Sequence, residues 1–172
     1  MPKLKYKRIL LKMSGEVFKG SLAAGIDYDV VVDLAKRVKK VRDMGVDIGI
    51  VIGGGNIWRY RDNKGKGKGY ELNRVTSDTI GMMATNMNAL AFEDVLNSVG
   101  CEAVALSAFP TPNAMKTYTV RRGRKALKKG KVVIFGGGTG SPFFTTDSAA
   151  AMRALEMRCD VLMKATKVDY VY

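Results

Sequence analysis

The chain has 172 residues, of which 47% are hydrophobic and 26% are charged, and its formal net charge is +13. This composition excludes global disorder, and no apolar run approaches the ~20 residues of a membrane helix, so we expect one globular domain over residues 1–172 without a membrane partner. The absence of histidine excludes Ser-His-Asp and Cys-His catalysis and most zinc chemistry, so we expect no set of metal-ligating side chains.

The first half of the chain predicts two strands and two helices. Apolar runs at 7–13 and 46–52 are typical of buried strands. Between them, apolar residues spaced three and four apart predict a helix with Asp29 as its N-cap and Gly45 as its stop. A second, long helix is expected near 76–98. Its apolar face is expected to contain Ile80, Met83, Met87, Leu90 and Ala91.

The second half continues the alternation of strands and helices. We expect strands at 102–108, 132–135 and 160–166, a basic helix at 119–129 and a further helix at 147–158. Strands that alternate with helices predict right-handed crossovers and parallel pairing. The expected fold class is therefore α/β, a three-layer sandwich with a mostly parallel central sheet.

Four of the predicted strands end in residues suited to binding phosphate. These segments are "KMSGE" (12–16), "GGGNIWR" (53–59), "GGGTGSPFFTTD" (136–147) and "KATKVD" (164–169). Alone, Lys12 is typical of a solvated lysine, and "GGGN" is consistent with a simple tight turn. Ligands of open α/β sheets, however, bind at the carboxyl ends of strands. Together the segments predict a site where glycine amides, Lys12 and Arg59 neutralise a phosphoryl group.

Other ligand classes have weaker support. Neither GxxxxGK[ST] nor GxGxxG occurs, which argues against a P-loop or a Rossmann dinucleotide site. Lysine and arginine cluster at 63–69 and 121–131, but no aromatic residue is interleaved to stack on bases. We therefore expect nucleic acid not to be the primary partner. Cys101 and Cys159 are isolated, which is typical of reduced thiols in the cytoplasm.

Seven segments, in order from about residue 6 to 172, closely resemble bacterial uridylate kinases (UMP kinases) of the amino-acid kinase superfamily. They are "LLKMSGE", "VVDLAKRVKK", "IVIGGGNIWR", "SDTIGMMATNMNALA", "LSAFP", "GGGTGSPFFTTDSAAAMRALEM" and "DVLMKATKVDYVY". "TGSPFFTTD" and "KATKVD" favour this family over carbamate, acetylglutamate, glutamate and aspartate kinases. The resemblance implies an amino-acid kinase fold and transfer of a phosphoryl group from ATP to UMP.

Site residues follow from the resemblance by position. It implies that Lys12, Arg59 and Asp147 are catalytic. On the ATP side it places Lys12, Met13, Ser14, Gly15, Gly55, Arg59, Thr166 and Tyr172. On the UMP side it places Gly54 at the phosphate, Asp78 at the ribose, and Thr139, Gly140, Ser141, Pro142, Phe143, Phe144, Thr145 and Thr146 around the nucleotide. It further implies Mg²⁺ bound mainly through ATP phosphates, a GTP effector near 20–25, and a homohexamer built from dimers that use the helix at 76–98.

Two of the proposed carboxylates have simpler alternatives as helix caps. Asp78 lies near the start of a predicted helix, and Thr146 or Asp147 is expected to cap the helix that follows. As a functional residue, Asp147 is expected to orient Lys12 or Mg²⁺-bound phosphate. Phe143 and Phe144 are expected to pack the loop.

The chemistry needs no imidazole. A nucleoside monophosphate is largely ionised near neutral pH, because its second pKa is about 6, so its oxygen attacks without a general base. We therefore expect an ATP:UMP phosphotransferase. Two alternatives stay open: a uridine-nucleotide-binding module without turnover, and a basic nucleic-acid-binding protein.

Two departures from the family affect the ATP side. The sequence has Tyr170 where the family has glycine, and the family continues beyond residue 172. We therefore expect part of the ATP half to be missing, and the chain to bind UMP better than ATP and to turn over poorly or not at all.

Overall fold

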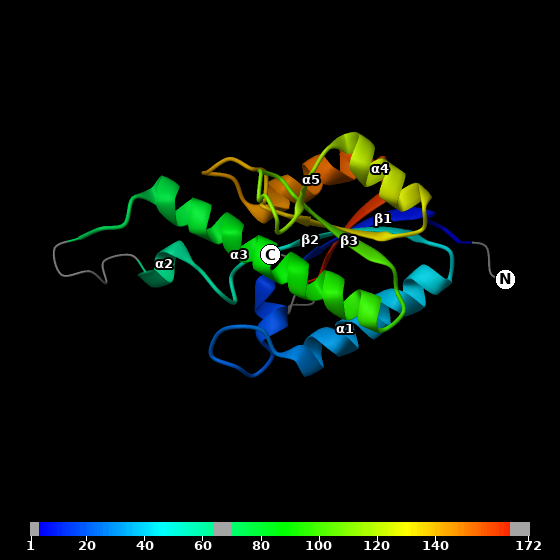
Figure 1. Cartoon of the computed structure of the whole chain (residues 1–172), viewed down its shortest axis with the longest axis horizontal. Helices are drawn as coiled ribbons and strands as arrows, with labels where there is room; N and C mark the ends of the chain where they lie inside the picture. The colour runs from blue at the N-terminus through cyan, green and yellow to red at the C-terminus, as the bar shows by residue number, and fades with distance from the viewer. Residues whose placement is uncertain (1–3, 64–69, 166–172) are drawn as a thin grey trace.

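The computed structural model of the protein describes residues 4–63 and 70–165 (Figure 1). Within these residues, six strands form one sheet with the order β4-β3-β5-β2-β1-β6, and every pairing in the sheet is parallel. The elements in chain order are β1 (Arg8–Met13), the 3-10 helix η1 (Gly15–Lys19), α1 (Tyr28–Asp43), β2 (Asp47–Ile52), α2 (Tyr60–Asn63), α3 (Arg74–Ser98), β3 (Ala103–Ser107), β4 (Lys116–Thr117), α4 (Val120–Lys128), β5 (Val132–Gly136), α5 (Thr146–Met157) and β6 (Val161–Ala165). The predicted α/β class and parallel sheet are confirmed.

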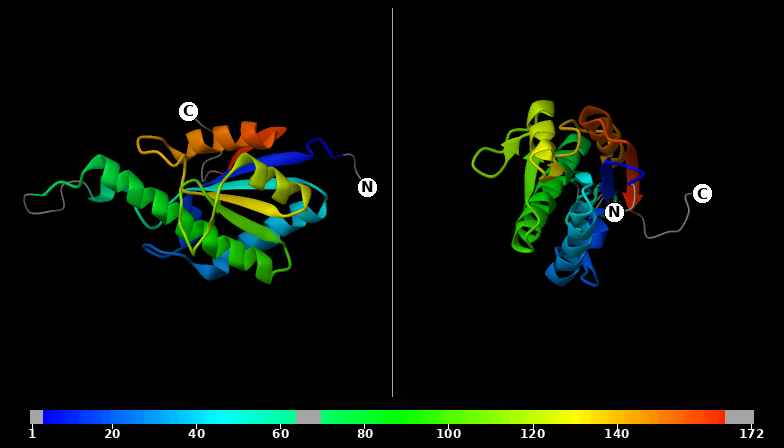
Figure 2. Two further views of the ribbon diagram at one scale, coloured as in Figure 1. Left: turned by 45° about the horizontal axis from the view of Figure 1, so that its top comes forward. Right: turned by 90° about the vertical axis from the view of Figure 1, so that its right-hand side faces the viewer.

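The sheet lies between two layers of helices. Helices α1 and α3 pack on one face, and α4 and α5 pack on the other (Figures 1 and 2). Each face has its own apolar cluster, one around Phe18 and Phe92, the other around Leu127 and Met157. The amino-terminal part of α3 extends beyond the sheet, which exposes that part of the helix to the loops at the carboxyl end of the strands (Figure 2).

The central strands are continuously apolar because both of their faces are buried. In β5, Val132 and Ile134 face the α1/α3 layer, whereas Val133 and Phe135 face the α4/α5 layer. All five residues of this strand are buried. Such runs are typical of parallel strands covered on both sides. Within the described residues, no helix combines the length and apolar character required to cross a bilayer.

Three predicted helix caps are wrong by one to five residues. Asp27, not Asp29, caps α1, and its side chain accepts a hydrogen bond from the Val30 amide. Asn73 caps α3, so Asp78 lies inside that helix, more than one turn from its start. Thr145 caps α5, so neither Thr146 nor Asp147 does so. In each case the cap is the residue whose side chain accepts a hydrogen bond from an orphan amide of the first turn, and another polar residue within five positions resembles it in sequence.

The predicted apolar face of α3 exists but does not face the core. Met83 and Met87 are 55% and 53% exposed. The side of α3 that packs on the protein instead carries small and polar residues such as Ala84, Asn88 and Ala89, each of which is buried. Around Met83 and Met87, hydrophobicity alone therefore identifies the wrong side of the helix as the buried one, whereas farther along the helix the buried residues Phe92, Val95 and Leu96 are apolar.

Candidate active site

The four predicted phosphate-binding segments begin at one edge of the sheet. Strands β5, β2, β1 and β6 are neighbours in that order and run parallel, so their carboxyl ends lie together. In register, Lys12 of β1 lies between Val51 of β2 and Lys164 of β6. The sheet topology thus brings Lys12 beside the glycine loop after β2 and beside the end of β6.

Two glycines let the loops after β1 and β2 pack backbone against backbone. A Cβ atom on Gly15 would lie 2.5 Å from the carbonyl oxygen of Gly53, and one on Gly54 would lie 2.8 Å from the carbonyl oxygen of Gly81 in α3. Real Cβ contacts do not reach these distances. The Gly53 amide also donates to the carbonyl oxygen of Met13 at 2.9 Å. The glycines are therefore required by close approach.

Two buried asparagines hold the Gly53–Gly55 loop. The side chains of Asn56 and Asn88 exchange two hydrogen bonds, of 2.7 and 3.0 Å. The amide nitrogen of Asn88 also donates to the Gly53 carbonyl at 2.8 Å, and that of Asn56 donates to the Gly25 carbonyl at 2.8 Å. Both side chains are almost fully buried. This network ties the glycine loop to α3 on one side and to the end of segment 20–25 on the other.

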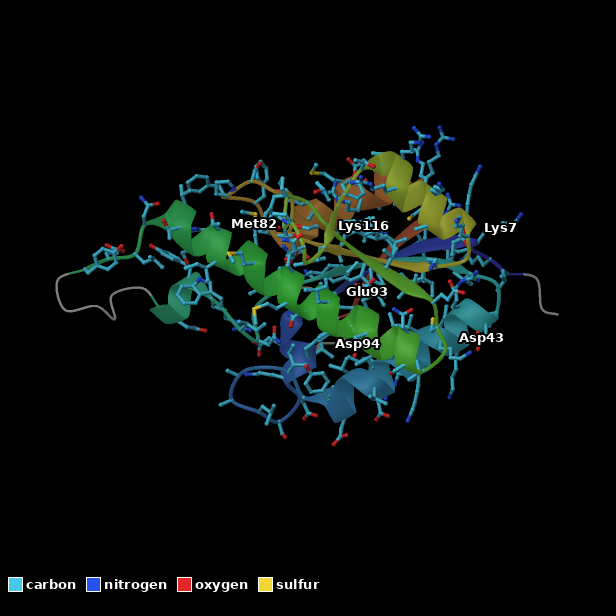
Figure 3. The ribbon with its side chains drawn as sticks, viewed as in Figure 1. Lys7, Asp43, Met82, Glu93, Asp94 and Lys116 are labelled. Atoms are coloured by element: carbon cyan, nitrogen blue, oxygen red, sulfur yellow. The ribbon has the colours of Figure 1, made fainter. Side chains whose placement is uncertain are left out.

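A pocket of about 180 Å³ lies between the amino-terminal part of α3 and the loop after β5. Its lining includes six residues predicted for UMP: Gly54, Asp78, Thr139, Ser141, Phe144 and Thr146. The remaining lining residues were not predicted: Trp58, Tyr60, Ser77, Gly81, Met82, Thr85 and Gly138. Figure 3 labels Met82, which lies on the part of α3 that borders this pocket.

Asp78 joins the two walls of this pocket. One carboxylate oxygen accepts a hydrogen bond from the Phe143 amide at 2.9 Å, and the other accepts one from the Arg74 guanidinium at 2.8 Å. Phe143 has a positive φ of 69°, so the loop reverses direction at this contact. A carboxylate has about four acceptor positions, so Asp78 retains capacity for ligand hydroxyl groups.

Lys12, Asp147 and Lys164 form a charged cluster next to the pocket. The Lys12 ammonium lies 2.8 Å from one oxygen of Asp147, and the Lys164 ammonium lies 2.9 Å from the other. The hydrogen bond from Lys12, aided by the one from Lys164, holds the pKa of the Asp147 carboxyl below its ordinary value. None of these three residues lines the pocket, but Asp147 directly follows the lining residue Thr146 in the first turn of α5.

Arg59 does not line this pocket. Its guanidinium forms an ion pair with Glu16, and its Nε donates to the carbonyl oxygen of Gly55 at 3.0 Å. Glu16 also pairs with Lys19 at 3.2 Å. A second hollow, of about 170 Å³, is lined by Arg59, Glu16, Gly55 and part of segment 20–25. Arg59 and the predicted effector segment are therefore neighbours.

Several predicted residues contribute backbone or caps rather than pocket-lining side chains. The Met13 side chain is buried in the core, and Ser14 caps η1 by accepting from the Glu16 amide. Gly140, Pro142, Phe143 and Thr145 do not line the pocket. The expectation that Phe143 and Phe144 pack the loop is wrong, because they are 65% and 62% exposed where the loop extends past the sheet. Thr166 and Tyr172 lie outside the described residues.

The residues missed from sequence share a simple cause. Lys164 and Glu16 gain their partners only through strand register and loop packing, and Trp58 and Tyr60 reach the pocket only through the fold of the loop after Gly53–Gly55. One signal was available for Asn88: a polar residue in "ATNMNALA" interrupts an apolar helical stretch. A buried polar side chain requires hydrogen-bond partners, which predicts a structural contact.

The described residues suit a phosphate ligand that arrives with a bound metal cation. Among them, no three Cys, Asp or Glu side chains come together in a way that could hold a metal ion. The carboxylate of the charged cluster is Asp147, flanked by two lysines. Mg²⁺ commonly binds through one or two carboxylates plus substrate phosphates, and Asp147 fits that pattern.

Comparison with known proteins identifies the family. Residues 7–172 match the amino acid kinase family. The chain is 48% identical over 169 residues to a uridylate kinase of Rickettsia bellii and 49% identical over 168 residues to one of Paramagnetospirillum magneticum, covering 98% of this chain and 69% and 68% of those proteins. The crystal structure of UMP kinase from Ureaplasma parvum superposes with a TM-score of 0.89 at 36% identity, over 98% of this chain and 70% of that one. The chain therefore belongs to the uridylate kinases of the amino acid kinase family.

Proposed function

We propose that this protein transfers the γ-phosphoryl group of ATP to UMP, giving UDP and ADP. The observation that carries the proposal is that Asp147 of the cationic cluster directly follows the pocket-lining residue Thr146. The pocket between α3 and the loop after β5 contains Gly54 and Asp78, and the Lys12–Asp147–Lys164 cluster adjoins it at Thr146. Acceptor binding and phosphoryl transfer thus have adjacent sites.

In this proposal the pocket binds UMP. The backbone amide of Gly54, which lines the pocket, meets the UMP phosphate. The Asp78 carboxylate accepts hydrogen bonds from ribose hydroxyls. Thr139, Ser141 and Thr146 offer hydroxyl groups to the nucleotide, and Phe144 and Trp58 offer aromatic surface to the base.

The transfer step depends on charge and position. The ionised UMP phosphate attacks the γ-phosphorus in line, so the protein needs no general base. Lys12 neutralises charge that develops on the transferring group, and Asp147 holds the Lys12 ammonium in place before ATP binds. When bound, Mg²⁺ would supply further charge neutralisation, and Asp147 is the carboxylate of the cluster that would hold it together with the ATP phosphates. Arg59 acts from the Glu16 side of the glycine loop.

Two further parts of the surface suit a subunit contact and an effector site. Met83 and Met87 form an apolar strip on the outer side of α3, which suits a subunit contact in a homo-oligomer. Segment 20–25 lies beside Arg59 and is hydrogen-bonded to Asn56, so a GTP effector near 20–25 has a direct route to the glycine loop.

An assay of both products tests the function. UMP, ATP and Mg²⁺ are incubated with the protein, and UDP and ADP are separated by chromatography. UDP and ADP in equal amounts support the proposal, and UMP-independent ADP release contradicts it. Calorimetric binding of UMP without UDP formation would instead favour a uridine-nucleotide-binding module.

A further inference from the structure

A second, strongly basic groove lies away from the candidate active site. It has a volume of about 730 Å³ and is lined by Val120 and by six cations: Arg8, Arg121, Arg124, Lys125, Lys128 and Arg158. Arg8 is the first residue of β1, whereas the active site lies beyond its carboxyl end. The groove therefore lies toward the amino-terminal ends of the strands, on the face of the sheet that α4 and α5 cover.

Two of the six cations have structural partners. Arg8 pairs with Asp47 at 2.9 Å and donates to the Met157 carbonyl at 2.9 Å, and Arg124 donates to the Glu156 carbonyl at 2.8 Å. These contacts cap the carboxyl end of α5, where carbonyl groups lack helical partners. Their replacement would disturb the fold, so they are unsuitable for testing a ligand.

The other four cations are exposed on the surface of the groove. No carboxylate in the described part of the chain pairs with Arg121, Lys125, Lys128 or Arg158. On α4, Arg121 and Lys125 are four residues apart and Lys125 and Lys128 are three apart, so like charges adjoin on the helix surface and repel. A bound anion would relieve this repulsion.

The lining favours a chain of phosphates over a single nucleotide. Among the described residues that line the groove, none is aromatic and only Val120 is apolar, so these residues offer N–H donors but no surface that recognises a base. Lys125 also lines a neighbouring basic groove with Lys116, Arg122, Lys129 and Lys131, so the cations continue around α4.

We propose that this groove binds the phosphodiester backbone of nucleic acid, independently of base sequence. The described lining has no aromatic residue to stack on bases, so its cations can contact only the phosphate backbone, which is common to all sequences. An anionic membrane is disfavoured, because amphipathic surfaces bind membranes with several apolar side chains and the described lining offers one. The proposal does not depend on the kinase activity.

Fluorescence anisotropy with a labelled short oligoadenylate tests this site, with saturating UMP present to occupy the acceptor pocket. Each phosphate contact to a single strand contributes about −0.7 to the slope of log affinity against log salt. Four contacts predict a slope of about −2.8, or about a 50-fold loss of affinity between about 50 and 200 mM salt.

A charge-matched pair of variants locates the binding. Lys125→Gln/Lys128→Gln should weaken binding about tenfold or more and reduce the magnitude of the slope by about 1.4. Lys36→Gln/Lys40→Gln removes the same charge from exposed positions on α1, across the sheet, and should bind like the wild type. Equal losses in both variants would overturn the proposal, since net charge alone would then explain binding. So would no binding at about 50 mM salt, or equally tight binding of polyglutamate of the same charge.

Discussion

Replacing Asn88 with alanine should destabilise the glycine loop far more than an ordinary polar substitution would. Asn88 is fully buried and makes three hydrogen bonds: two with Asn56 and one to the Gly53 carbonyl. At about 1 kcal/mol net for each bond, the variant loses about 3 kcal/mol of unfolding free energy. The acceptors left behind on Gly53 and Asn56 are also buried, so this figure is a lower estimate.

Thermal unfolding measures this loss. For a chain of this length, about 3 kcal/mol corresponds to a fall in Tm of about 6–12 °C. Asn97→Ala on the same helix is the matched control, because Asn97 is exposed and accepts one hydrogen bond, from the Ala103 amide. That variant should lose about 1 kcal/mol or less.

The double variant separates the shared bonds from the rest. Asn56→Ala/Asn88→Ala should lose about 2 kcal/mol less than the sum of the two single variants, because two hydrogen bonds are common to both. Additive losses within about 0.5 kcal/mol would refute the reasoning, since independent sites add to that precision. A fall in Tm no larger than that of Asn97→Ala would refute it as well.

Three further predictions concern charge. Lys12→Met should lower turnover by about 10²–10³ while UMP affinity, measured by calorimetry, stays nearly unchanged; near-normal turnover would remove Lys12 from the mechanism. The pKa of Asp147 should lie below 3.8 in an NMR titration and rise in Lys12→Met, so its ion pairs stabilise the protein above that pH and are lost as pH falls through the folded-state pKa; an unshifted pKa would contradict this. Burial raises the pKa of the Cys159 thiol to about 11, so alkylation should be slow at neutral pH and accelerate toward pH 11; rapid alkylation at neutral pH would contradict it.

The fold could be predicted from the sequence because each strand and helix has its own local pattern of apolar residues. Strands such as 132–135 are continuously apolar, and helices such as 119–129 are amphipathic, so element type and order followed directly. The helix caps were harder to predict, since Asp27 and Asp29 are chemically identical and only the backbone conformation selects one of them as the cap. The buried side of α3 was also hidden, because Ala84 and Asn88 pack there while Met83 and Met87 face outward.

The candidate site could be predicted from the sequence only in part. The glycine segments and Lys12 are recognisable because close backbone approach and a strand-end cation leave sequence patterns. Contacts across the sheet leave none: Lys164 meets Asp147 only because β6 pairs with β1, and Glu16 meets Arg59 only because the two loops pack together. Such pairings depend on register, which one sequence does not encode locally.

Titration of UMP and of 2′-deoxy-UMP into the wild type and Asp78→Ala tests the central claim most directly. We predict that the wild type binds UMP more tightly than the deoxy compound, and that Asp78→Ala weakens UMP binding about tenfold or more and loses the preference. Asp94→Ala, an exposed carboxylate variant elsewhere on α3 (Figure 3), should bind like the wild type. Unchanged UMP affinity and preference in a folded Asp78→Ala protein would contradict the assignment of this pocket to UMP.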